Sequence, residues 1–432
     1  MVTNTQPGAR RSRICGAFLI RWLKWLSCLA ATLLHGPVAA ATGDTGNAPA
    51  APSAATAMPA TAPPATPAAT SDAAKPPLPT REEMGMRNAL VHDPSTIVKC
   101  KDEYWVFNTG RGIISWHSKD LITWTRGQPV FVTPPAWVAT YVPGNRPLDY
   151  WAPDVIFVKG QYLLYYAAST FGSQTSAIGL ATNPTLDQAD PNYKWTDQGP
   201  IINTLSPRDY PGLGNNFNAI DPAVIATPEG RLWLCLGSFW TGIKLVELDP
   251  ATGRRTSLDS QVYSLATNNN PQHDVEGSYI YHHGDYYYLF VNWGKCCSGV
   301  ASTYKIMIGR SKDVTGPYLD QAGVDLAKGG GTLFLGSEGD FIGPGHAGII
   351  EVDGKFWFSC HFYDGATPRG TSLLATRLLH WDADGWPAIE PKQNYVAENT
   401  RAAPARGRAG APAGSAAGSG APGRGRAPGS GA

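Results

Sequence analysis

Residues 273–290 read HDVEGSYIYHHGDYYYLF and contain the unit from which the fold is built. The carboxylic acid Glu276 stands beside small residues, and two apolar runs follow it with a turn between them. Ile, Tyr and Phe favour β-strands, and Gly-Asp is a common turn signal. The stretch therefore predicts a buried β-hairpin with an acid at its start.

The same pattern occurs four more times along the chain. It recurs as HDPSTIVKCKDEYWVF (92–107), PDVIFVKGQYLLYY (153–166), IDPAVIATPEGRLWLCL (220–236) and GHAGIIEVDGKFWFSC (345–360). The polar residue that opens each repeat is here termed its head residue. The head residues lie 55 to 70 positions apart and are Asp93, Asp154, Asp221, Glu276 and His346. Such self-similarity at a roughly constant period indicates a repeat architecture.

Further strand-like runs between these hairpins raise the number to about four strands per repeat. These runs are GIISWHS, SAIGLAT, GIKLVEL, YKIMIGRS and SLLATRLL. Five repeats of about four strands predict an all-β, five-bladed β-propeller. A sandwich or a barrel could also hold many short strands, but neither explains five repeats with similar head residues.

A propeller gives the head residues a common location. The first strand of each blade lies nearest the axis, so residues far apart in sequence are expected to meet at one mouth of the central channel. Collecting carboxylates there costs electrostatic energy and shifts their pKa values, which indicates a functional site. The structural alternative is that Asp-Pro, present in two of the repeats, forms an Asx turn at the start of a strand.

Composition agrees with a β-rich enzyme or binding protein. The chain has 432 residues, of which 16% are charged and 10% aromatic, with 48 Gly and 36 Pro. That mixture suits short strands and tight turns better than helices. The formal net charge of +1 gives no reason to expect nucleic acid as a partner.

The first forty residues resemble an export signal. Three arginines precede the apolar stretch FLIRWLKWLSCLAATLL, and the small residues VAAA follow at 38–41. We expect residues 1–40 to be a signal peptide cleaved near Ala40, giving a secreted or periplasmic protein without membrane attachment. Because Arg21 and Lys24 interrupt the apolar run, a retained N-terminal anchor is the alternative, and a lipid-anchored Cys28 is a weaker one.

Two low-complexity segments flank the predicted propeller at 84–398. Residues 41–83 are mostly Ala, Pro and Thr, and residues 399–432 are rich in Gly, Ala and Arg. Neither composition can bury a core, so both are expected to be disordered. Within the propeller, the adjacent Cys296 and Cys297 could form a vicinal disulfide or remain two thiols, and no cysteine spacing suggests zinc.

Several motifs in their order along the chain resemble glycoside hydrolase family 43, and within it the endo-1,5-α-L-arabinanases. They are HDPSTI, DYWAPDV, STFGSQTSAIGLATNP, NAIDPAV, GSFWTGIKL, CCSGVASTYKIMIGRSKDVTGPY, GGGTLFLGS and GPGHAGI. The resemblance covers roughly residues 88–395. VEGSYI departs slightly from the EAPYI-like sequence expected beside the acid. The extra C-terminal β domain of some relatives is replaced by the low-complexity tail.

The resemblance implies the roles of three carboxylates. Asp93 would be the general base, Glu276 the general acid, and Asp221 the residue that raises the pKa of Glu276 and orients it. In an inverting glycosidase, base and acid stand about 6.5–9.5 Å apart to leave room for a water molecule. A neighbouring negative charge keeps the acid protonated near neutral pH.

The resemblance also implies a metal and a sugar-binding surface. His346 would be the one protein ligand of a water-coordinated calcium ion, or alternatively would orient the acids by hydrogen bonds. Asp154 is either structural or sugar-binding, and aromatic side chains are candidate platforms for sugar rings. The predicted substrate-binding residues are Trp151, Asp154, Phe171, Gly172, Asn218, Ala219, Ile220, Ser238, Phe239 and Trp240.

The resulting hypothesis is a secreted, monomeric hydrolase that cleaves internal α-1,5-L-arabinofuranosyl bonds of pectin arabinan by an inverting mechanism. One alternative is an exo-acting α-L-arabinofuranosidase or β-xylosidase of the same family, in which a loop such as 133–150 closes one end of the groove. A second is a non-catalytic carbohydrate-binding propeller, although such a protein has no use for a poised acid.

Overall fold

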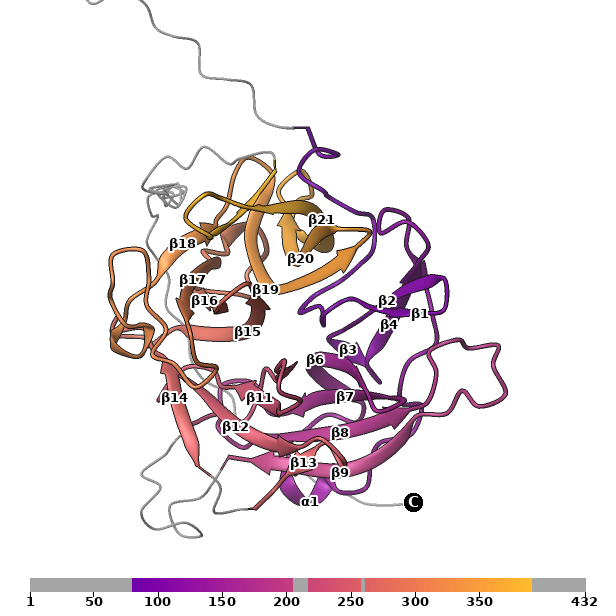
Figure 1. The fold of residues 1–432 in the computed structure, drawn as a ribbon. Coiled ribbons are helices and arrows are strands. Elements are labelled where there is room, and N and C mark those ends of the chain that lie inside the picture. The colour runs from indigo at the N-terminus through magenta and orange to yellow at the C-terminus, as the bar shows by residue number, and fades with distance from the viewer. Residues whose placement is uncertain (1–79, 205–216, 258–260, 391–432) are drawn as a thin grey trace, which may run out of the picture. The chain divides into compact units, whose positions relative to one another are not determined.

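The structure is a computed structural model that describes residues 80–204, 217–257 and 261–390. These residues form three four-stranded and two five-stranded antiparallel sheets around a central axis (Figure 1). The predicted five-bladed β-propeller is confirmed. The predicted signal peptide, nearly all of the first low-complexity segment and the whole of the second lie outside the described residues. Within the described part, no helix is long and apolar enough to cross a membrane.

The blades follow one another along the chain. Their elements are β1 (Val98–Cys100), β2 (Glu103–Asn108), β3 (Gly110–Arg111), β4 (Ile114–Ser118), β5 (Thr125–Arg126), α1 (Val138–Tyr141), β6 (Asp149–Val158), β7 (Gln161–Ala168), β8 (Ala177–Asn183), β9 (Thr196–Asn203), β10 (Ala223–Ala226), β11 (Leu232–Leu236), β12 (Ile243–Asp249), β13 (Arg254–Arg255), β14 (Val262–Ala266), β15 (Val275–His283), β16 (Tyr286–Trp293), η1 (Gly299–Ala301), β17 (Lys305–Ser311), η2 (Leu326–Lys328), β18 (Thr332–Leu335), β19 (Phe341–Val352), β20 (Lys355–Asp364), β21 (Thr371–Trp381) and β22 (Pro387–Ile389).

Each blade is an antiparallel meander whose strands pair in chain order. The five sheets are β1-β2-β4-β5, β3-β6-β7-β8-β9, β10-β11-β12-β13 with β14 also on β12, β15-β16-β17-β18 and β19-β20-β21-β22. The short β3 leaves the first blade and pairs with β6 of the second, Gly110 opposite Tyr150. In Figure 1, β6, β15 and β19 lie near the axis.

The hydrophobic core is divided into five clusters, each formed between two neighbouring blades. Strand β16 shows how one sequence serves two clusters. Tyr288 and Phe290 pack toward the fifth blade, whereas Leu289 and Val291 pack toward the third. Successive side chains of a strand point to opposite faces, so a strand buried on both faces needs a continuous apolar run. This is why the sequence reads YYYLF without polar interruption.

The N-terminal segment at 85–91 closes the ring by pairing with β21 of the last blade. The backbone N–H of Arg87 donates to the carbonyl oxygen of Leu374, and the N–H of Thr376 donates to Gly85. The side-chain hydroxyl of Ser372 donates to the carbonyl oxygen of Val91, across 281 positions of sequence. The first and fifth blades are thereby joined by backbone pairing as well as by a hydrophobic cluster.

Because Gly85 lies in the contact that closes the ring, we expect substitution of this residue to destabilise the protein strongly. This residue has φ of +67°, and a side chain there would run into the carbonyl oxygen of Thr376. Gly354, in the β19–β20 turn, has φ of +72° but open space around it. Both Gly→Ala variants incur about 1–2 kcal/mol of left-handed backbone strain. Gly85→Ala adds about 1–3 kcal/mol of steric overlap, because backbone must move to make room.

Urea unfolding of the Gly85→Ala and Gly354→Ala variants measures this difference. Equal losses of unfolding free energy in the two variants would show that the contact between 85–91 and β21 does not stabilise the ring.

Candidate active site

A residue with left-handed backbone conformation stands in the inner strand of every blade or in the segment that leads into that strand. The five are Asp93, Ala152, Asp221, Gly277 and His346, with φ between +39° and +56°. Residues other than glycine adopt this backbone conformation only at a cost in conformational energy. Because it occurs once per blade at the same place, it defines the structurally equivalent position of the repeat.

This equivalence corrects the sequence alignment of the head residues. Asp93, Asp221 and His346 occupy the equivalent position, but Asp154 lies two residues beyond Ala152 and Glu276 lies one residue before Gly277. The register of pairing shifts around Ala152, Gly277 and His346 alike, so the same irregularity recurs in β6, β15 and β19.

Asp93 is buried and surrounded by hydrogen-bond donors and histidines. Its Oδ2 accepts a hydrogen bond from Thr109 Oγ1 at 2.7 Å and lies 2.8 Å from Nδ1 of His92. Its Oδ1 lies 3.1 Å from Nδ1 of His346. Burial alone would raise the pKa of Asp93, but the fields of His92 and His346 outweigh it and hold that pKa well below its usual value. Asp93 is therefore a carboxylate over the whole neutral range.

His346 joins the carboxylates of different blades. Its Nδ1 faces Asp93, and its Nε2 lies 4.0 Å from Oδ2 of Asp221. Neither ring nitrogen makes a well-aligned hydrogen bond to any of the described residues. Burial would lower the pKa of His346, but the charges of Asp93, Asp221 and Glu276 raise it to about 9. A positive charge, carried by a proton or by a metal, is thus favoured at this ring.

Glu276 and Asp221 form a second acidic pair. Glu276 accepts hydrogen bonds from Ser238 Oγ at 2.7 Å and from the hydroxyl of Tyr304 at 3.0 Å. Asp221 Oδ2 accepts the backbone N–H of Gly277, the residue after Glu276, at 3.1 Å. Burial raises the pKa of both acids, and the negative charges of Glu276 and Asp93 further raise that of Asp221, to about 7. The two acids therefore hold a proton between them near neutral pH.

Asp154 has a different environment from these three acids. Its Oδ1 accepts the backbone N–H of Thr96 from the first blade, and its Oδ2 accepts that of Val224 from the third, both at 2.8 Å. Asp154 is only 4% exposed. Since it connects the blades on both sides of its own, its placement favours the structural of the two roles that the sequence leaves open.

The predicted sugar-binding residues divide into exposed and buried ones. Phe171 is 83% exposed and Trp240 is 39% exposed. Trp151 is half-buried, and Gly172 is exposed. The residues available to a ligand thus include four aromatic side chains, because Phe239 beside Trp240 is also half-buried.

Residues 218–220, which directly precede Asp221, are buried and hydrogen-bonded to neighbouring segments. The Asn218 side-chain oxygen accepts a hydrogen bond from Ser176 Oγ at 2.6 Å, and the carbonyl oxygen of Ile220 accepts the N–H of Gly237. Ala219 is fully buried. The loop that carries Phe239 and Trp240 is fixed by a hydrogen bond from the buried Lys244 to the carbonyl oxygen of Thr241.

Several residues of the site are not predicted by the sequence. Asn292 comes from β16, Tyr304 directly precedes β17, and His361 and Tyr363 come from β20. Asn292 accepts the backbone N–H of His346 and donates to the carbonyl oxygen of Pro344. Tyr304 stands within the family-like stretch CCSGVASTYKIMIGRS, so that motif is the one signal that could have indicated it.

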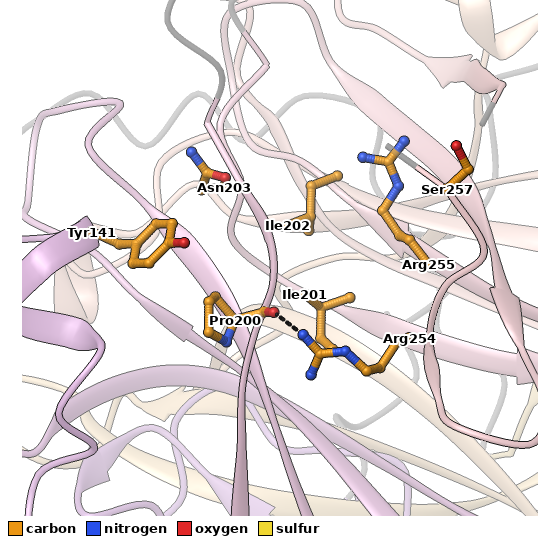
Figure 2. A pocket seen from close by; sticks show the side chains of 8 residues that line it. All are labelled: Tyr141, Pro200, Ile201, Ile202, Asn203, Arg254, Arg255 and Ser257. Atoms are coloured by element: carbon orange, nitrogen blue, oxygen red, sulfur yellow. Dashed lines mark hydrogen bonds between the residues drawn. The ribbon is translucent and has the colours of Figure 1, made fainter. Parts of the chain in front are cut away.

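A pocket of about 310 Å³ lies away from these carboxylates, beside β9 and β13. Figure 2 shows Tyr141 on one side of it and Arg254 and Arg255 on the other. The guanidinium of Arg254 donates hydrogen bonds to the carbonyl oxygens of Gln198 and Pro200, so it already has a structural role in binding β9. Among the described residues no acid lines this pocket, so they do not provide it with the groups for acid–base hydrolysis.

The chain was compared with known proteins. Residues 86–387 match the sequence profile described as Glycosyl hydrolases family 43. The chain belongs to glycosyl hydrolase family 43. This family 43 enzyme is thus a glycoside hydrolase, and the resemblance inferred from its motifs is confirmed.

Two relatives of the family 43 enzyme carry different activities in their names. The extracellular endo-alpha-(1->5)-L-arabinanase 1 of Bacillus subtilis is 40% identical over 308 residues, which are 70% of this chain and 89% of the relative. The extracellular exo-alpha-(1->5)-L-arabinofuranosidase ArbA of Cellvibrio japonicus is 37% identical over 327 residues, which are 73% and 92%.

Among solved structures, the Cellvibrio cellulosa α-L-arabinanase complexed with arabinohexaose superposes with a TM-score of 0.64 at 38% identity. The match covers 69% of the family 43 enzyme and 95% of that chain.

The role of Asp154 can be tested by Asp154→Asn. The amide would turn its NH2 group toward one of the two backbone N–H donors, leaving that donor buried without an acceptor. We expect a loss of about 1–3 kcal/mol in unfolding free energy, with KM for the polysaccharide unchanged well below the melting temperature. The exposed Asp285→Asn is the control. A raised KM with unchanged stability would instead assign Asp154 to sugar binding.

Proposed function

We propose that this enzyme hydrolyses internal α-1,5-L-arabinofuranosyl bonds of arabinan with inversion of configuration. The observation that carries the proposal is the meeting of Asp93, Asp221 and Glu276 around His346, although they come from three different blades. One of these acids is held fully ionised while the other two share a proton, which is the division that acid–base hydrolysis needs.

In the proposed reaction Asp93 is the general base. It takes a proton from a water molecule, whose oxygen attacks the anomeric carbon of the arabinofuranose ring. The bond from that carbon to the glycosidic oxygen breaks as Glu276 donates its proton to the leaving oxygen. Attack from the face opposite the leaving group inverts the configuration. Positive charge that develops on the ring carbon is shared with the ring oxygen.

Asp221 serves this reaction through Glu276. It binds the backbone N–H beside Glu276 and so fixes the position of the acid, while its negative charge opposes ionisation of Glu276. Ser238, which follows β11, and Tyr304, which precedes β17, each donate a hydrogen bond to a different oxygen of Glu276. The acid therefore has a fixed direction in which to deliver its proton.

Arabinan is the proposed substrate because relatives at 37–40% identity bear arabinanase or arabinofuranosidase names over nearly their full length. We propose endo action, which is the mode in the name of the Bacillus subtilis relative. Exo action is the second candidate, since the Cellvibrio japonicus relative is named as exo-acting and matches over a similar length. The exposed Phe171 and Trp240 provide faces on which successive sugar rings could stack.

We also propose that the channel binds a calcium ion. The two buried ring nitrogens of His346 lack aligned partners among the described residues, and three carboxylates surround the ring, so the site fits a cation held by one imidazole nitrogen and by water molecules. When bound, the ion supplies the positive charge that the His346 proton supplies otherwise. Ion and proton compete for the nitrogen, so binding weakens as pH falls.

Export of the enzyme as a monomer completes the proposal. The export part of this proposal is supported by the leader-like sequence at 1–40 and by the word extracellular in the names of both relatives.

The reaction is tested with the variants Asp93→Ala and Glu276→Ala on linear 1,5-α-arabinan. Each should lower kcat by about 10²–10⁴-fold with little change in binding, because each removes a proton-transfer group. The exposed Glu351→Gln, on the same strand as His346, should behave like wild type. Wild-type products of mixed length indicate endo action, and arabinose alone indicates exo action. Binding of arabinan by wild type without cleavage would refute the enzymatic proposal.

The pH dependence of activity follows from the protonation states of Asp93 and of the Asp221–Glu276 pair. The pKa of Asp93 lies well below 3.8, so the base stays active in mild acid, whereas activity falls as pH rises and the Asp221–Glu276 pair loses its proton. Interaction between two charges is mutual, so Asp221→Asn should lower the pKa of Glu276. The alkaline limb of kcat/KM then moves to lower pH. An unmoved limb would contradict the modulating role of Asp221.

Calcium is tested by chelation at neutral pH. EDTA should lower both kcat and the melting temperature, and added CaCl2 should restore them. His346→Ala should remove the response to both reagents. If EDTA leaves the wild type unchanged, the positive charge in the channel belongs to the imidazolium.

A further inference from the structure

Behind Asp93, on the side of His92, runs a chain of hydrogen bonds that the proposed reaction does not use. Nδ1 of His92 lies 2.8 Å from Oδ2 of Asp93, and Nε2 of His92 lies 2.8 Å from the hydroxyl of Tyr363. The same hydroxyl accepts the backbone N–H of Cys297 at 2.7 Å. The chain thus extends from the carboxylate through an imidazole and a phenol to a backbone amide.

When His92 is neutral, the two ends of this chain set its direction, because the Asp93 carboxylate can only accept a hydrogen bond and the Cys297 amide can only donate one. An amide N–H can only donate, so the Tyr363 oxygen is an acceptor toward Cys297 and its own proton is free to donate to His92 Nε2. Tyr363 is 3% exposed and burial raises its pKa, so the hydroxyl keeps that proton. With Nε2 accepting, Nδ1 of His92 carries hydrogen and donates to Asp93.

Packing holds the imidazole of His92 in this orientation. The ring of His361 stacks on it with centroids 4.5 Å apart and planes 15° apart. His361 is itself fixed, because its Nδ1 accepts the backbone N–H of Asp93 at 3.1 Å. The carboxylate and backbone of Asp93 are therefore both held by this pair of stacked histidines.

The amide at the end of the chain belongs to a constrained turn. Cys296 and Cys297 form a vicinal disulfide, which closes a small ring around the peptide bond between them. Gly299, just beyond, approaches the loop after β20 so closely that a side chain there would overlap the carbonyl oxygen of Arg369. The turn is docked against the loop that follows the strand carrying Tyr363.

We propose that His92, Tyr363 and the Cys296–Cys297 turn form a positioning relay for Asp93. The relay fixes the tautomer of His92, and His92 fixes the rotamer of the carboxylate that must receive a proton from water. Tyr363 and the disulfide turn are positioning residues in this scheme and do not touch the reacting atoms. The inference rests on the proposed role of Asp93 as general base.

Tyr363→Phe removes the donor to His92 and leaves the ring in place. We expect kcat to fall about 10- to 100-fold with KM within about 2-fold, since a hydrogen bond to the base is lost and sugar contacts are not. Tyr318→Phe is the matched control, because Tyr318 is also buried and its hydroxyl donates to the carbonyl oxygen of Val314. The control should match the wild type in kcat.

A double-mutant cycle distinguishes the relay from a purely structural effect. His92→Asn keeps an N–H donor toward Asp93 but cannot accept from Tyr363. It should retain more activity than His92→Ala, and adding Tyr363→Phe to it should cost nothing further. Likewise, Cys296→Ala with Cys297→Ala should lower kcat in the wild type but not in Tyr363→Phe.

Additive losses in these cycles, or a Tyr363→Phe enzyme with wild-type kcat, would overturn the relay. If Asp93→Ala itself keeps wild-type kcat, the proposed function fails instead, so the two failures can be told apart.

Discussion

The channel of this propeller depends on an electrostatic balance between buried acids and one imidazole. Asp93, Asp221 and Glu276 are brought close together in a region with little water, where each would resist ionisation in the presence of the others. His346 lies among them and offsets part of that repulsion. The balance is unequal, because two histidines face Asp93 whereas Asp221 and Glu276 share the weaker compensation. Because of this inequality, Asp93 is ionised, whereas Asp221 and Glu276 share a proton.

The backbone provides the geometry that the electrostatics requires. In each blade one residue at the equivalent position adopts a left-handed conformation, and Asp93, Asp221 and His346 are three of the five. The cost of that conformation is met by the blades, whose strands are buried on both faces between neighbouring sheets. Glu276 and His346 lie in strands, and Asp93 and Asp221 lie in buried segments that lead into strands, whereas the exposed Phe171 and Trp240 lie in loops.

The fold and the main site residues could be predicted from the sequence because both follow a repeat. Five aromatic-rich hairpins with polar head residues required a ring, and a ring required that the head residues meet. The exact alignment does not follow from the polar residues alone, because Asp154 lies two residues after the equivalent position and Glu276 lies one residue before it. Tyr304 and Tyr363 were not found because strand pairing and ring closure, not sequence distance, bring them to the site.

The closing contact between 85–91 and β21 has a consequence for how the protein is made. A ribosome delivers the N-terminal segment early, but its partner strand arrives only after the other four blades have been synthesised. Until then the ring is open and the interface between the first and fifth blades is exposed to solvent. A nascent chain of this kind cannot close its ring until most of it has been translated.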